Sequence, residues 1–161
     1  MNPLKHLVAI GASLLLLCLA GSPAVRAGNT VASPDVRVTD GWVRLLPGGL
    51  PAAGYLTLHN DSSHEIALTA VRSSAFDNVH LHESYTTPDG NSGMRPVKRL
   101  AVPAHGEVRL APGGYHLMLM GAKRRLKPGE KVGFEFRFAG GATLEAFLVA
   151  RPADATGPGG K

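Results

Sequence analysis

Apolar and polar residues alternate with a period of two along most of this chain, in short runs that fit strands better than helices. Turn-forming residues separate the runs, as in Pro-Asp-Gly at 88–90 and Pro-Gly-Gly at 112–114. The pattern predicts nine strands, at residues 36–45, 54–60, 65–71, 78–84, 94–97, 107–110, 115–120, 131–138 and 143–150. Such short strands with frequent turns indicate an all-β fold, an antiparallel β-sandwich or Greek-key barrel.

The amino-terminal residues depart from this alternation. Lys5 precedes an apolar run over residues 7–20, and Ala27 supplies a small residue suited to a cleavage site. This order is typical of a secretory signal peptide, and a membrane span would need about 20 apolar residues. Leu17 argues against lipoprotein cleavage before Cys18, because a small residue is expected at that position. We therefore expect residues 1–27 to be removed on export to the periplasm.

Cleavage would leave residues 28–153 as one domain and residues 154–161, rich in Gly and Pro, as a disordered tail. The only cysteine, Cys18, would leave with the signal peptide, so the mature protein would have neither thiolate nor disulfide. The formal net charge of +5 is mild, and no interleaving of basic and aromatic residues indicates nucleic-acid binding. No motif of a serine hydrolase, zinc protease or phosphate loop is present, and we expect no enzyme.

Two predicted strands each carry imidazole or thioether groups on a single face. Side chains alternate across a strand, so His116, Met118 and Met120 share one face of the strand at 115–120, and two leucines share the other. On the strand at 78–84, two histidines separated by one residue occupy one face in the same way. The other face of each strand remains available for a core.

Neutral nitrogen and sulfur donors of this kind suit Cu(I), and they suit poorly the hard ions that prefer carboxylate oxygens. Zinc sites usually combine Cys, His and carboxylate. A blue-copper electron-transfer site requires a Cys thiolate, which the mature chain lacks. A lone Met on a strand is usually core filler, but here all the methionines after Met1 lie in the segment that carries these histidines.

The spacing of four residues resembles the mark of the periplasmic copper chaperones called PCuAC. In that family a His is followed after about ten residues by a Met, and after twenty-one more by His-x-Met; here the residues are His82, Met94, His116 and Met118. Flanking segments are similar too, above all Pro-Gly-Gly-Tyr-His-Leu-Met-Leu-Met-Gly at 112–121. The first spacer is eleven residues long, which fits a turn enlarged by one residue.

The resemblance implies a cupredoxin-like sandwich that binds one Cu(I) per monomer through these four residues. It also implies delivery to the copper centres of cytochrome c oxidase, in the assembly of its CuA site. The acceptor would be an oxidase subunit, with another periplasmic copper chaperone as a second candidate partner.

Several alternatives remain open from the residues alone. A copper-dependent redox enzyme with a His2Met site, or a structural sandwich that binds no metal, would fit the same fold. The roles of His80 and Met120 are undecided, since the four-donor set is complete without them. The remaining mature histidines are interpreted as surface residues: His59, His64 and His105.

Basic residues follow both halves of the four-residue set: Lys98 and Arg99 come after Met94, and the basic cluster at 123–127 comes after Met120. These charges either dock an acidic acceptor or form an ordinary solvated face.

Overall fold

The computed structural model describes residues 35–159, and the expected signal peptide at 1–27 lies outside them. This part of the chain contains ten strands: β1 (Val36–Arg44), β2 (Ala52–Asn60), β3 (Ile66–Arg72), β4 (Phe76–Thr86), β5 (Ser92–Pro96), β6 (Leu100–Val102), β7 (Gly106–Leu110), β8 (Tyr115–Ala122), β9 (Lys131–Phe138) and β10 (Thr143–Arg151). No helix occurs among these residues, and none is therefore long and apolar enough to cross a membrane.

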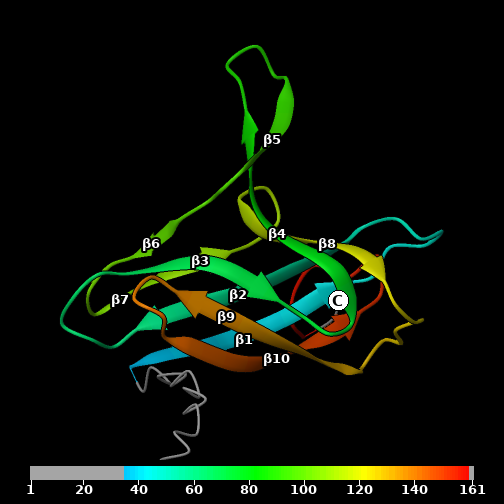
Figure 1. Ribbon diagram of the computed structural model, residues 1–161. Coiled ribbons are helices and arrows are strands. Elements are labelled where there is room, and N and C mark those ends of the chain that lie inside the picture. Colours follow the sequence, from blue (N-terminus) through cyan, green and yellow to red (C-terminus); the bar gives the residue numbers. More distant parts are fainter. Residues whose placement is uncertain (1–34, 160–161) are drawn as a thin grey trace, which may run out of the picture.

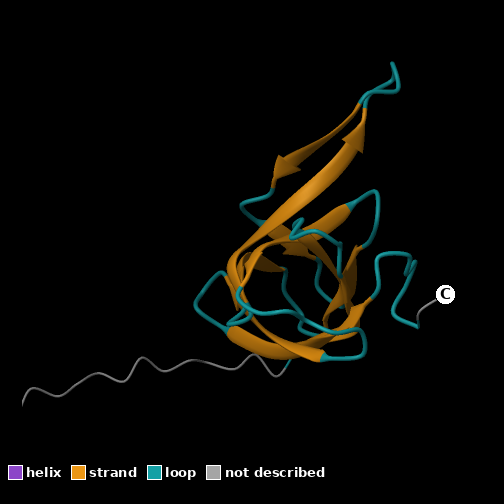
Figure 2. Cartoon of the chain, turned by 90° about the vertical axis from the view of Figure 1, so that its right-hand side faces the viewer, coloured by secondary structure: helices purple, strands orange, loops and turns teal. Residues whose placement is uncertain are grey.

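The strands follow the order β5-β4-β8-β2-β1-β10-β9-β3-β6, with β7 paired to β2 off this path. Neighbours are antiparallel except β1 and β10, which pair in parallel. Seen from the side in Figure 2, the strands curl around a common interior. The all-β sandwich expected from the alternation is confirmed, and each of the nine predicted strands overlaps an observed one.

The core fills the interior with the side chains that the alternation assigned to one face of each strand. Leu58, Leu117, Phe136 and Leu148 are completely shielded from solvent. They belong to one continuous apolar cluster to which every strand except β5 contributes. Leu117 therefore anchors β8 in the core at a point between His116 and Met118.

The outer part of β4 and β5 projects beyond the body of the sandwich as a two-stranded arm, residues 83–96 (Figure 1). Its turn is closed by Thr87, whose amide donates to the carbonyl of Asn91 at 2.8 Å and whose hydroxyl accepts from the Asn91 amide at 3.2 Å. Gly90 has a φ of 84°, a conformation that glycine adopts without strain. This hydrogen-bonded turn accommodates the longer first spacer.

Two features differ from the expectations. The tenth strand, β6, is only three residues long and pairs with β3, too short a run for alternation to reveal. The described part of the tail, residues 154–159, packs against the sandwich instead of being disordered. Ala155 is 3% exposed beside Trp42 and Tyr55, and Arg151 donates to the carbonyl of Pro158. The sequence did not predict this contact, because Ala155 is a single small apolar residue in an otherwise polar segment.

Candidate metal centre

The register of β4 against β8 brings the histidines and methionines of both strands together. His82 lies directly opposite His116, and His80 lies directly opposite Met118. Residues opposite each other in a sheet project from the same face. The imidazoles and the β8 thioether groups therefore share one face, as the alternation predicts, while Leu117 points into the core.

Met94 joins this face from the other side of β4. It lies on β5 opposite Ser84, which makes it the diagonal neighbour of His82. Diagonal neighbours remain within reach of long side chains. The four residues predicted as ligands thus lie on one face of three adjacent strands, in the order β5, β4, β8.

A backbone carbonyl orients the ring of His116. Its Nδ1 lies 3.1 Å from the carbonyl oxygen of Gly114, which also accepts the amide of Ser84 at 3.1 Å. A carbonyl oxygen only accepts, so Nδ1 of His116 carries the hydrogen and the lone pair of the neutral ring is on Nε2. In metal sites, a hydrogen bond from the ring nitrogen that does not bind the metal orients the imidazole in this way.

The ring of His82 is held close to that of His116 and has an unsatisfied nitrogen. The two ring centroids are 5.9 Å apart, with the planes at 87°. Nδ1 of His82 is buried and has no hydrogen-bond partner. A buried polar atom without a partner is costly, and a metal ion that accepted its lone pair would remove that cost.

Burial and two neighbouring imidazoles favour the neutral form of His82, which is the form that binds metal. Burial lowers the pKa of His82, and the nearby imidazoles of His116 and His80 lower that pKa further. A neutral imidazole offers its lone pair without first losing a proton, so competition from protons is reduced near pH 7.

The residues of the candidate centre differ in their exposure to solvent, from buried on β8 to exposed on the arm. His116 is 7% exposed, whereas Met94 on the arm is 55% exposed. Within residues 35–159, no three His, Cys, Asp or Glu side chains gather as a metal site. The register places the thioethers of Met94 and Met118, two soft side chains, on the same face as the two imidazoles.

The other histidines lie apart from this face. His59 on β2 is only partly exposed, and its ring contacts Thr39 at 2.8 Å and Glu107 at 3.0 Å. The expectation of a simple surface residue is therefore wrong for His59, which has a structural role. His64 is exposed, as expected.

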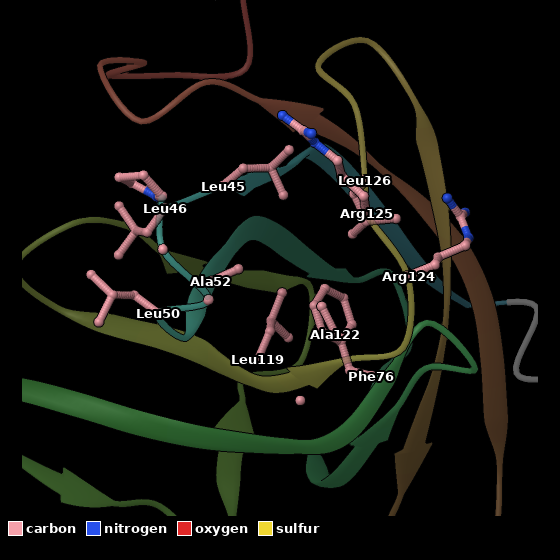
Figure 3. A pocket seen from close by; sticks show the side chains of 14 residues that line it. Leu45, Leu46, Leu50, Ala52, Phe76, Leu119, Ala122, Arg124, Arg125 and Leu126 are labelled. Carbon is pink, nitrogen blue, oxygen red and sulfur yellow. The ribbon is translucent and has the colours of Figure 1, made fainter.

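The basic cluster after β8 lies at the end of that strand remote from His116. Six residues of extended chain separate His116 from Ala122, about 20 Å. Arg124 forms an ion pair with Glu130. Arg125 lines a hollow of about 620 Å³ whose apolar wall includes Phe76 and Leu119 (Figure 3).

The sequence did not reveal the residues that hold the arm together on its other face, or the backbone group that orients His116. On the opposite face of the arm, Glu83 accepts from Arg95 at 2.8 Å, and the ring of Tyr85 lies over Gly93. The carbonyl of Gly114 is a backbone group, and no residue type announces its role.

Solved structures of copper-binding domains share this fold. The solution structure of CuI-DR1885 from Deinococcus radiodurans is 32% identical to this chain, with a TM-score of 0.59 over 80% of this chain and 85% of that one. The copper-bound PCuAC domain from PmoF2 is 19% identical, with a TM-score of 0.60 over 74% of this chain and 94% of that one. The resemblance to PCuAC domains is therefore confirmed in three dimensions.

Sequence comparison adds the family. The family model described as "Putative lipoprotein LpqE-like" matches residues 36–149. "Putative lipoprotein Lxx21020" from Leifsonia xyli subsp. xyli is 31% identical over 126 residues, which make up 78% of this chain and 75% of that protein. The chain therefore belongs to the LpqE-like family and has the fold of PCuAC domains.

Proposed function

We propose that this protein is an exported metallochaperone that binds one Cu(I) ion through His82, Met94, His116 and Met118. The observation that carries the proposal is the buried Nδ1 of His82, which has no hydrogen-bond partner. The ring of His82 lies 5.9 Å from that of His116, measured between centroids, and the two neighbouring strands each place a thioether group on the same face. Two imidazoles and two thioethers form an uncharged, soft donor set, which selects Cu(I).

The comparisons support copper as the cargo. DR1885 is described with Cu(I) bound, and it is more than 30% identical to this chain. The lipoprotein descriptions of the family and of the Leifsonia relative support export, in line with the amino-terminal pattern. We infer a location in the periplasm, outside the cytoplasmic membrane.

The uneven exposure of the donors supports transfer over storage. His116 would hold the ion on its buried side. Met94 on the exposed arm would be the donor that an incoming ligand reaches first. An acceptor with thiolate and imidazole ligands, such as the CuA subunit of cytochrome c oxidase, would displace a neutral thioether before it displaces an oriented imidazole. We propose such a subunit as the acceptor.

Anaerobic titration of the protein with Cu(I) against a competing chelator tests the binding. We expect one tight equivalent, weakened roughly tenfold or more in His116→Ala and in Met118→Leu. His64→Ala is the matched control, because it removes an exposed imidazole that lies apart from the donors. Wild-type protein that binds Cu(I) no better than the His116→Ala/Met118→Leu double variant would contradict the proposal.

A second measurement separates a chaperone from a redox enzyme with a His2Met site. The copper-loaded protein is mixed with oxygen and a reductant, and oxygen consumption is followed. We expect consumption no faster than that of the metal-free protein and no change on mutation of Met94. Rapid turnover that is lost in Met94→Leu would favour the enzyme.

A further inference from the structure

Two copper-compatible side chains on the β4–β8 face remain outside the four-donor set. They are His80 on β4, which is exposed, and Met120 on β8, which is 39% exposed. Neither contributes to the core, because Val79 and Leu119 next to them point inward. The fold therefore does not explain why an imidazole and a thioether occupy these positions.

The register places the two side chains within reach of one ion. Met120 lies opposite Asn78, so His80 and Met120 are diagonal neighbours on one face. The Cα atoms of such neighbours lie about 7–8 Å apart, and their Cβ atoms lie closer. An imidazole and a thioether extending from these positions can therefore reach a single ion held between them.

We propose that His80 and Met120 form a second, weaker Cu(I) position beside the first. The choice of metal rests on the proposed function, but the donor pair is separate from the four ligands named there. Two donors hold an ion less tightly than four, and the exposed ring of His80 is not oriented by a carbonyl as the ring of His116 is. Repulsion between two neighbouring cations weakens the second position further.

The two positions adjoin along the strands. The rings of His80 and His82 are stacked, with centroids 6.2 Å apart and planes at 15°. Met118 lies directly opposite His80 and diagonal to His82, between the two positions. A copper ion that leaves His82 therefore meets His80 and Met120 within one step along the sheet, on the side facing solvent. The second position would bind copper transiently, on the solvent-facing side, as the ion enters or leaves the first position.

Titration with Cu(I), and in parallel with Ag(I) as a redox-inert substitute, tests the second position. Methionine methyl groups are labelled with carbon-13 and followed by NMR. We expect the first equivalent to shift the methyl signals of Met94 and Met118, and a second, weaker equivalent to shift that of Met120. His80→Ala and Met120→Leu should each abolish the second equivalent. Met120→Leu should also leave the affinity for the first within about twofold, because Met120 lies four residues along β8 from His116.

Asn78→Ala is the matched control, because Asn78 lies on the same face opposite Met120 and offers no soft donor. It should retain both equivalents. A single equivalent in wild type, or a second one that survives in the His80→Ala/Met120→Leu double variant, would overturn the inference and leave the proposed function intact. Absence of the first equivalent would instead overturn the proposed function.

Discussion

His82 and His116 face each other from opposite positions on β4 and β8, and their rings meet edge to face at 87°. Both backbones are fixed by the strand pair, and Gly114 holds the ring of His116. The imidazoles are therefore set in place by the sheet before any ion arrives. Preorganisation of this kind lowers the cost of binding, because few side-chain rotations must be frozen.

The first prediction concerns the atoms around copper. X-ray absorption of the reduced, copper-loaded protein should show mixed nitrogen and sulfur scattering, because two imidazoles and two thioethers share the face. Met94→Leu should lower the sulfur contribution and leave that of nitrogen. A first shell of nitrogen and oxygen alone would contradict the assignment of Met94 and Met118.

The second prediction concerns pH and the stability of the metal-free protein. The pKa of His82 is lowered from 6.5 by burial and by His116 and His80, and its partner on β5 is the uncharged Pro96. The unfolded chain therefore binds this proton more readily than the folded protein does. Stability from neutral His82 is present above about pH 6.5 and is lost as pH falls through the lowered folded pKa.

Urea unfolding of the metal-free protein at about pH 7.5 and at lower pH measures this loss. His82→Gln should show a smaller loss than wild type, and His64→Ala should match wild type. Equal pH dependence in wild type and His82→Gln would show that His82 does not carry the effect.

The third prediction tests the arm. Gly90→Ala puts a side chain at a φ of 84°, with no atom close enough to clash, so its cost is backbone strain of about 1 kcal/mol. A strained turn loosens Met94, and Cu(I) affinity should fall by up to about fivefold. Gly129→Ala is the matched control, since Gly129 has a φ of 88° and equal space in a turn remote from the donors. It should leave Cu(I) affinity unchanged.

Particular residues show how far the sequence carried the fold and the candidate centre. Alternation assigned Leu117 to the core and His116 to the opposite face, because the strand period is two. It did not set the register that places His82 opposite His116, since register depends on which strands pair. The parallel pairing of β1 with β10 and the burial of Ala155 depend on contacts between distant segments. The role of the four residues as copper ligands stays a prediction.

The fourth prediction concerns the basic cluster. Arg124 is already paired with Glu130, whereas Arg125 lines the hollow beside Phe76 and Leu119. If this end of β8 docks an acidic acceptor, Arg125→Ala should slow copper transfer at low salt more than Arg124→Ala does. Charges at a docking surface act mainly on the rate of encounter.

Transfer to a soluble oxidase fragment carrying the CuA ligands measures this rate. The difference between variants should shrink at about 1 M salt, where screening acts within about 3 Å. Cu(I) affinity of the isolated variants should equal that of wild type. Equal transfer rates at low salt would assign the cluster to an ordinary solvated face.

The arm has a consequence for how long a bound ion stays. β5 ends the strand order and pairs only with β4, so opening the arm breaks few hydrogen bonds and exposes none of the continuous core. Such a unit opens locally at a lower free energy than the whole protein unfolds. If Met94 binds copper as proposed, the residence time of the ion is governed by how often the two strands of the arm separate. Substitutions in the arm can shorten or lengthen that time while the melting temperature of the sandwich stays the same.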